Sequence, residues 1–268
     1  MSDRTGQHVA SYRLMRLLEQ GTTINRYLAS DLTTQRQVTL LLASQTDEPG
    51  ILRFQRNLPI IQRLAHPHIA PLLDAGVQDM TPFVVLDPLP TSRQAHRLPL
   101  PIPTIVQSVS QLADAFDFAH SQGVWHTYTA PETLLLGPRG EALLGGFGLR
   151  LLEISQAPGE GRWAFPVSPA YLAPEQVVRA GSMDKSIDQY ALAVVVYEWL
   201  CGVPPSQGTT PLEITLHQLH DPPSSLQGKI SAASVGMERV LMKALSKEPK
   251  LRFATMNEFA RALAGQSG

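Results

Sequence analysis

Lysine is scarce in this sequence and is missing from most of its length. The chain has 268 residues, and only five of its 22 basic residues are lysine. The first of the five is Lys185. A P-loop ends in Gly-Lys-Ser/Thr because its lysine contacts the phosphates of a nucleotide. The 184 residues before Lys185 therefore contain neither a P-loop nor any lysine-based chemistry such as a Schiff base.

Cysteine and net charge are also nearly absent. Cys201 is the single cysteine, which excludes an internal disulfide and any zinc site built from cysteines. The 22 basic residues almost balance 23 acidic residues, so the formal net charge is −1. A chain of this charge has no overall field that would recruit nucleic acid or a membrane surface, and we predict neither as a partner.

Long hydrophobic runs are lacking as well. Residues 1–7 are polar and contain no apolar core of a signal peptide. The longest mostly apolar run, residues 191–203, is too short to span a bilayer and contains Glu198. We therefore predict a cytoplasmic protein, or a cytoplasmic domain excised from a longer chain.

The first part of the chain has the alternation of β-strands. Apolar residues make up 43% of the sequence, enough to fill the core of one large domain or two lobes. After a polar tail, residues 1–11, a helical stripe over residues 51–65 is interrupted by Pro59, which predicts a helix that begins late or kinks. Strands are predicted near residues 12–14, 26–29, 37–42, 70–77 and 82–86.

The composition changes at residues 87–103, where five prolines favour a connector over a regular helix. Residues 124–180 are rich in loop formers. Helices are predicted over residues 104–121, 187–201, 211–219, 232–246 and 255–264. A β-rich part followed by a larger helical part predicts an α+β fold with two lobes.

Four motifs follow one another in the second half of the chain. They are HTYTAPETLLL at residues 126–136, GGFGL at 145–149, APE at 173–175 and IDQYALAVVVYE at 187–198. In this order and spacing the sequence resembles the protein kinase superfamily, and most of all bacterial serine/threonine kinases. The resemblance implies one bilobal kinase-like domain: an N-lobe at residues 12–86, a proline-rich hinge at 87–103 and a C-lobe at 104–264.

The resemblance gives structural roles to residues that match the family. His126 would open the H-R-D motif, and Asp188 would accept hydrogen bonds from the backbone of the catalytic loop. Glu175 would pair with Arg252 of the penultimate segment. The predicted structural anchors are His126, Phe147, Gly148, Glu175, Asp188 and Arg252.

The polar positions that carry kinase chemistry hold other residues. Leu41 stands where the family has its phosphate-holding lysine, and Tyr128 stands where it has the catalytic aspartate. The substituted positions are Leu41, Asn57, Tyr128, Ala130, Thr133 and Gly146. Kinases act by positioning and electrostatic stabilisation, and a general base alone contributes about 10²- to 10⁴-fold. From these substitutions we predict a pseudokinase that is not an enzyme.

The nucleotide-binding positions are altered too. Only Gly21 remains of the glycine-rich loop, and the carboxylate of Glu19 would repel a phosphate. Arg26 is expected either to occlude the pocket or to turn into solvent. We predict no cofactor and no metal, but backbone groups near Asp87 leave weak metal-free nucleotide binding as an alternative. The vestigial pocket would comprise Glu19, Gly21, Arg26, Thr39, Asp87, Leu89 and Leu135.

An aromatic pair in the loop-rich segment, Trp163 and Phe165, is expected to pack into the vacated cleft or to contact a partner. We predict an interaction, scaffolding or allosteric module in serine/threonine kinase signalling. Its partner would be another signalling protein, an active kinase or another domain of the same longer chain. The alternative is an altered transferase, for which the cleft offers only Glu132 and Asp87 as acids.

Overall fold

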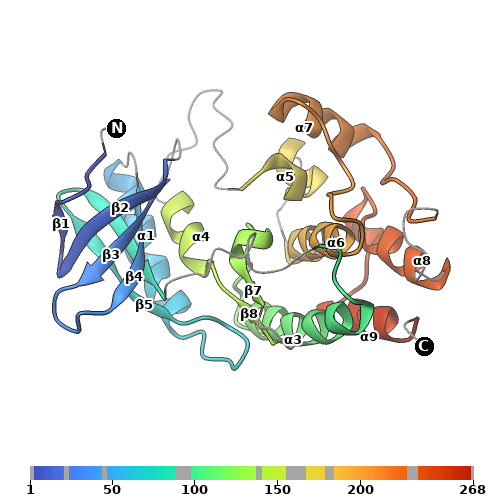
Figure 1. The fold of residues 1–268 in the computed structure, drawn as a ribbon, viewed down its shortest axis with the longest axis horizontal. Helices are drawn as coiled ribbons and strands as arrows, with labels where there is room; N and C mark the ends of the chain where they lie inside the picture. Colours follow the sequence, from blue (N-terminus) through green and yellow to red (C-terminus); the bar gives the residue numbers. More distant parts are fainter. Residues whose placement is uncertain are drawn as a thin grey trace. The chain divides into compact units, whose positions relative to one another are not determined.

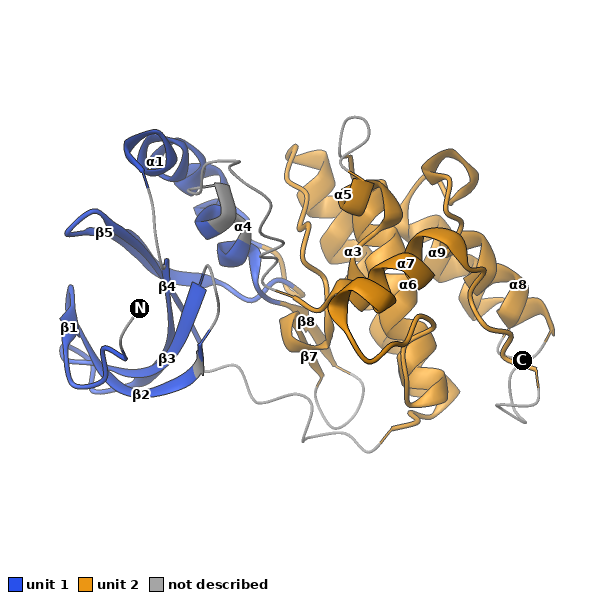
Figure 2. Cartoon of the chain, turned by 90° about the horizontal axis from the view of Figure 1, so that it is seen from above, with its two compact units in different colours: residues 1–65, 69–90, 145–166 blue, residues 66–68, 91–144, 167–268 orange. Residues whose placement is uncertain are grey.

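The computed structural model forms two compact units, which Figure 2 shows in different colours. Unit 1 comprises Met1–Ala65, Ile69–Pro90 and Gly145–Pro166, and unit 2 comprises His66–His68, Thr91–Leu144 and Val167–Gly268. The β-rich first part and the helical second part that the sequence predicts are both present (Figure 1). The structure describes residues 3–20, 24–43, 47–87, 98–136, 141–154, 167–178, 184–227 and 235–266.

A curled antiparallel sheet dominates unit 1. Its order is β1-β2-β3-β4-β6-β5, so β2 and β5 are not neighbours. The hydroxyl of Tyr12 on β2 nevertheless donates a hydrogen bond to Asp74 Oδ2 on β5, at 3.0 Å. The sheet therefore curls until its two ends meet, and its concave side encloses a core that includes Tyr27, Leu40 and Val85. The strands are β1 (His8–Val9), β2 (Tyr12–Gln20), β3 (Ile24–Asp31), β4 (Gln37–Ala43), β5 (Leu72–Gln78) and β6 (Thr81–Leu86).

Helix α1 (Glu48–Gln62) begins earlier than the sequence predicts. Asp47 caps it, and its carboxylate accepts a hydrogen bond from the Gly50 backbone N–H at 2.8 Å. A proline in the first turn loses no helical hydrogen bond, because that N–H has no partner within the helix anyway. The helix then continues through Pro59. Of the two alternatives predicted from Pro59, the late start is wrong, and the kink stays a prediction.

Helix α4 (Phe147–Ile154) is a second helix of unit 1 that the sequence does not predict, since residues 124–180 look loop-rich. It packs against α1, β4 and β6. Gly148 makes this packing possible, because a Cβ there would lie 2.3 Å from Val84 Cγ1 on β6. The buried side chains of α4 are Phe147, Leu149, Leu151 and Leu152.

Unit 2 is built around α6 (Ser186–Cys201), which is buried along almost its whole length. Helix α3 (Ile102–Ser121) begins two residues inside the predicted connector and packs against α9 (Met256–Ala264). Asp117 on α3 caps α9, accepting the backbone N–H groups of Met256 and Asn257 at 3.0 Å each. The other elements are β7 (Leu134–Leu136), β8 (Ala142–Leu144), α5 (Pro174–Val178), α7 (Pro211–His220), α8 (Val235–Ala244) and the 3-10 turns η1 (Pro131–Thr133), η2 (Pro169–Tyr171) and η3 (Pro249–Leu251).

Among the described residues, no helix combines the length and the apolar character needed to cross a membrane.

Candidate functional site

The loop that follows α3 is held in place by a single buried carboxylate. Asp188 lies in the first turn of α6 and is fully buried. Its Oδ2 accepts the backbone N–H of His126 at 2.8 Å, and its Oδ1 accepts the backbone N–H of Thr127 at 2.7 Å. The predicted contact between Asp188 and the backbone of this loop is therefore present in the structure.

A histidine outside the predicted set supports the same carboxylate. His120 Nε2, at the end of α3, lies 2.8 Å from Asp188 Oδ2. Burial alone would raise the pKa of Asp188, but the hydrogen bond and charge of His120, together with His126, hold that pKa below its ordinary value. Asp188 is therefore an ionised acceptor at neutral pH. His120 and Asp188 are 68 residues apart in the sequence, so no local sequence pattern indicates this contact.

Thr127 adopts a conformation that threonine rarely adopts. Its φ is +73°, in the left-handed region that β-branched residues avoid. Two contacts hold it there: its N–H donates to Asp188, and its carbonyl oxygen accepts a hydrogen bond from Gln176 Nε2 at 3.0 Å. Gln176 also accepts the Ala173 N–H at 2.8 Å. Gln176 thus joins the APE segment to the loop, a role that nothing in the sequence pattern signals.

The predicted pair of Glu175 and Arg252 is a buried bidentate ion pair. Arg252 Nη1 lies 2.6 Å from Glu175 Oε1, and Arg252 Nη2 lies 2.8 Å from Glu175 Oε2. The guanidinium also donates to the carbonyl oxygens of Ser186 and Ser246. Four of its five N–H groups are used in these bonds, so Arg252 links α5, the start of α6 and the segment before α9.

The segment that contains η2 is fixed by two further contacts that the sequence does not predict. The Tyr171 hydroxyl donates to Glu198 Oε2 at 2.7 Å. Gln218 Nε2, on α7, donates to the carbonyl oxygens of Ala170 and Leu172 at 3.1 and 2.6 Å. The surface that this segment presents is therefore rigidly supported from α6 and α7.

The substituted positions of unit 2 are tightly packed. Tyr128, Ala130 and Thr133 are each at most 1% exposed. The Thr133 hydroxyl donates to the Ala130 carbonyl oxygen at 2.9 Å and accepts the Ala130 N–H at 3.1 Å. These bonds use its proton and one of its two oxygen lone pairs within the loop.

The substituted positions of unit 1 are also occupied by packing or by local bonds. Leu41 on β4 is 1% exposed and pairs in register with Arg26 on β3 and Val84 on β6. The amide of Asn57, on α1, donates to the Arg53 carbonyl oxygen of its own helix at 2.7 Å. Gly146 has a φ of +89° and no side chain to offer.

The residues at the two magnesium positions do not fit a magnesium ion. Magnesium in such sites is held by carboxylate or amide oxygens. Thr133 offers a hydroxyl that is already bonded, and Gly146 offers none. Among the described residues, no three His, Cys, Asp or Glu side chains lie close enough together to hold a metal ion.

The predicted nucleotide-pocket residues are only partly described. Thr39 on β4 is buried, and Leu135 on β7 is half-buried. Arg26 is half-buried on β3, where its register partner on β2 is Glu19, and its predicted occlusion of a pocket stays a prediction. Asp87 lies 3.5 Å from Arg36 Nη2. Gly21, Leu89, Trp163 and Phe165, and the side chain of Glu19, lie outside the described residues.

Comparisons with known proteins agree with one another. A family model described as the protein kinase domain matches residues 12–262. Serine/threonine-protein kinase Pkn1 of Myxococcus xanthus is 30% identical over 271 residues, which cover 96% of this chain and 38% of Pkn1. Serine/threonine-protein kinase PknB of Mycobacterium leprae is 28% identical over 259 residues, covering 92% of this chain and 41% of PknB. The chain thus spans about two fifths of the length of these relatives.

A solved structure gives the same result. The kinase domain of Mycobacterium tuberculosis PknI matches with a TM-score of 0.73 and 27% identity, covering 99% of this chain and 100% of that chain. This match confirms the predicted bilobal kinase-like fold, with the curled sheet in one lobe and the helices in the other.

The same comparisons contradict the prediction that the chain is not an enzyme. That prediction depended on six substituted side chains alone. The matching relatives are named serine/threonine-protein kinases, and the structural neighbour is a kinase domain. These matches point to an active protein kinase.

Proposed function

This chain belongs to the protein kinase family, and from that membership we propose that it acts in bacterial-type serine/threonine kinase signalling by binding and regulating another signalling protein. Its partner would be an active kinase, another signalling protein or a further domain of a longer chain. The proposal concerns binding and holds whether or not the domain also transfers phosphate. A cytoplasmic location stays a prediction that accompanies it.

One observation carries this proposal. Buried hydrogen bonds support the surface of the C-lobe, and the side chains at the substituted positions of the loop are buried. Asp188 binds the loop backbone, and Arg252 binds Glu175 with two hydrogen bonds. Tyr128 and Ala130 of the loop are buried. A rigid surface over a well-packed interior is what a protein-binding module needs, because little conformational entropy is then lost on association.

Phosphoryl transfer to a serine or threonine is the second candidate function, and the comparisons favour it. The named relatives are serine/threonine-protein kinases, and the family model covers residues 12–262. Transfer by this chain would need phosphate-contacting groups other than those at Leu41 and Ala130, which carry no charge. The experiment that tests phosphoryl transfer also tests weak metal-free nucleotide binding and altered transferase chemistry.

The binding proposal is tested with purified proteins. The chain is titrated, by calorimetry, with each serine/threonine kinase domain encoded by the same genome, and the activity of that kinase is measured in the same mixture. We expect one kinase to bind with a micromolar or lower Kd and to change its rate. Binding should weaken at least about tenfold in Trp163→Ala, since aromatic side chains often carry interface energy. The control Met80→Ala, which truncates an exposed side chain of unit 1, should leave it unchanged.

Phosphoryl transfer is measured separately, so that the two candidates fail independently. The isolated chain is incubated with ATP and magnesium, and phosphate on the chain and on a serine/threonine peptide is quantified by mass spectrometry. The PknI kinase domain serves as the positive control. Thermal shifts with ATP, with and without magnesium, report nucleotide binding. Transfer by the chain would establish the second candidate, whereas the absence of any binding partner would overturn the first.

A further inference from the structure

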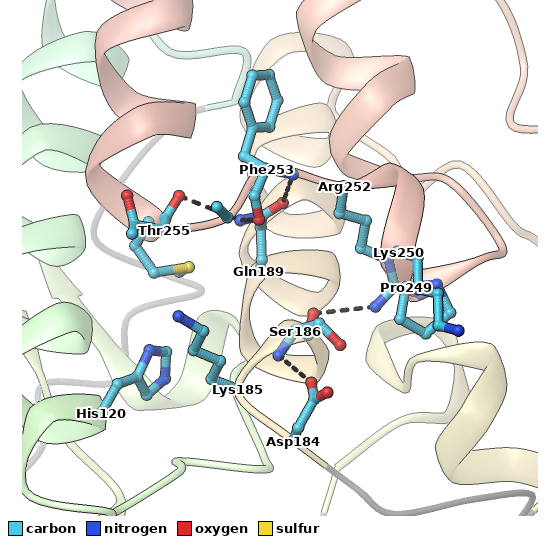
Figure 3. A pocket seen from close by; sticks show the side chains of 12 residues that line it. His120, Asp184, Lys185, Ser186, Gln189, Pro249, Lys250, Arg252, Phe253 and Thr255 are labelled. Atoms are coloured by element: carbon cyan, nitrogen blue, oxygen red, sulfur yellow. Dashed lines mark hydrogen bonds between the residues drawn. The ribbon is translucent and has the colours of Figure 1, made fainter.

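Lys247 differs from the other described lysines in its surroundings. Lys185 and Lys250 line a pocket of unit 2 and are exposed (Figure 3). Lys243, on α8, is also exposed, and its Nζ lies 4.2 Å from the centroid of the Phe253 ring. Lys247 follows α8 and is half-buried. Among the described residues it is therefore the one lysine that is not exposed.

Two elements of unit 2 contact the ammonium group of Lys247, and both offer it neutral groups. Its Nζ donates to the Gln218 carbonyl oxygen in the last turn of α7, at 2.5 Å. It lies 3.4 Å from the Tyr190 hydroxyl on α6 and 5.9 Å from the centroid of the same ring. Lys247 makes no ion pair with any residue that the structure describes. Its charge is thus partly removed from water without a carboxylate in contact with it.

The charges nearby do not replace the missing ion pair. Asp221, directly after α7, attracts the ammonium group, but its Oδ2 lies 2.9 Å from His217 Nδ1. Arg252, before α9, is a second positive charge, although Glu175 is paired with it. Burial outweighs Asp221 and, together with Arg252, lowers the pKa of Lys247 to about 8. At that pH about half of its amines are uncharged, against about 0.3% for a lysine of pKa 10.5.

We propose that Lys247 is an acylation site, which accepts the acyl group of a small acyl phosphate or acyl thioester. A lysine that is desolvated, or that lies beside another cation, is a nucleophile near neutral pH. The lone pair of the neutral Nζ attacks the acyl carbon and forms a C–N bond. The C–O or C–S bond of the donor breaks, phosphate or thiolate leaves with the bonding electrons, and the proton lost from Nζ passes to water.

Acylation at this position changes the support of α7. An amide nitrogen carries no charge, so the bond to the Gln218 carbonyl oxygen is no longer assisted by charge. The side chain of Gln218 donates to the carbonyl oxygens of Ala170 and Leu172, which ties η2 to α7. We therefore expect amide hydrogen exchange in α7 and η2 to become faster once Lys247 is acylated.

The test uses the whole chain, with acetyl phosphate as the acyl donor, between about pH 6.5 and pH 9.5. The chain is then unfolded and its unreacted lysines are capped with deuterated acetic anhydride, so that mass spectrometry gives the acetylated fraction of each lysine. At about pH 7.5 we expect Lys247 to react about tenfold faster than Lys243 or Lys250. Its rate should level off above about pH 8, whereas the rates of the two exposed lysines keep rising.

A charge variant and a matched control separate the environment of Lys247 from simple exposure. Asp221→Asn removes the negative charge that opposes burial, so the rate at Lys247 should level off at a lower pH than in the wild type. Asp79→Asn, in an exposed turn of unit 1, should leave the profile unchanged. The proposal is overturned if Lys247 reacts no faster than Lys243, or if its rate has the pH profile of the exposed lysines.

A second donor, acetyl coenzyme A, identifies the source of the acyl group. Faster reaction of Lys247 with acetyl phosphate supports the site and assigns its donor to the acyl phosphates. Faster reaction with acetyl coenzyme A supports the site and assigns its donor to the thioesters. Partner binding and phosphoryl transfer are measured in separate experiments, so the acylation of Lys247 stands or fails by itself.

Discussion

Thr127 is a residue whose β-branched side chain disfavours the left-handed backbone conformation that its hydrogen bonds to Asp188 and Gln176 hold in place. A left-handed conformation costs an L-residue about 1–2 kcal/mol, and glycine avoids this cost but loses about 0.5–1 kcal/mol through its freer unfolded state. The Thr127 hydroxyl is also buried without a hydrogen bond. We therefore expect Thr127→Gly to raise the free energy of unfolding by about 1 kcal/mol in urea titrations.

The control for this prediction is Thr129→Gly in the same loop. Thr129 is fully buried and does not have a positive φ, so its replacement gains no relief of strain. We expect a loss of about 1–2 kcal/mol there. Similar losses in both variants would show that the conformation of Thr127 stores no strain.

Lys247 is a residue whose charge depends on its surroundings near neutral pH. Its Nζ donates to the Gln218 carbonyl oxygen at 2.5 Å and lies 3.4 Å from the Tyr190 hydroxyl. Burial, and to a smaller extent the charge of Arg252, lowers its pKa to about 8, although Asp221 acts in the opposite direction. Between that value and 10.5 the unfolded chain binds more protons than the folded chain, so stability should rise with pH in this window.

Lys247→Met isolates this effect, because it keeps the aliphatic stem and removes the ammonium group. We expect the difference in unfolding free energy between wild type and Lys247→Met to shift in favour of the wild type from pH 8 to pH 10.5. Denaturant titrations at several pH values measure it. Lys243→Met provides the matched comparison, and a difference for Lys247→Met that stays constant with pH would contradict the prediction.

At the scale of elements, helix α4 depends on one close approach. A Cβ at position 148 would lie 2.3 Å from Val84 Cγ1. We expect Gly148→Ala to lower the free energy of unfolding by about 1–3 kcal/mol, the usual cost of overpacking a core. Val84→Ala removes the methyl group that would clash with this Cβ. The loss of unfolding free energy in the double variant should therefore be smaller than the sum of the two single losses, by at least about 1 kcal/mol. Strictly additive losses of unfolding free energy would mean that the contact with Val84 does not cause the destabilisation in Gly148→Ala.

At the scale of the whole molecule, the chain divides into two compact units, and the ion pair of Glu175 and Arg252 lies entirely in unit 2. Removing one partner of a buried pair costs about 3–5 kcal/mol, because the other charge stays buried alone. We expect Glu175→Gln to speed amide hydrogen exchange in α6 and α9 while β3 and β4 of unit 1 keep their protection. Hydrogen exchange read by mass spectrometry measures this, with Gly148→Ala as the reciprocal variant. Equal acceleration in both units would mean that they open together.

Much of the fold was predictable from local patterns. Apolar alternation located strands β2 to β6 of unit 1, and helical stripes located the helices of unit 2 to within a few residues. Strand β1 was missed: residues 1–11 were predicted to be a polar tail, but His8 and Val9 pair with β2 and Val9 is buried. Helix α4 was missed because its apolar face is short and becomes stable only against α1 and β6. The start of α1 was predicted wrongly because the prediction relied on Pro59, which lies in the last turns of the helix. The N-cap residue Asp47 determines where the helix begins.

The candidate site was predictable from the sequence only at residues that belong to a family motif. The sequence by itself determined which residues stand at the family positions, because these motifs are short and keep their order along the chain. The tertiary structure decided two contacts that no motif indicates: His120 with Asp188 and Gln176 with Thr127, over separations of 68 and 49 residues. Such pairs leave no local pattern. They form because packing of the helices brings distant side chains within hydrogen-bonding distance.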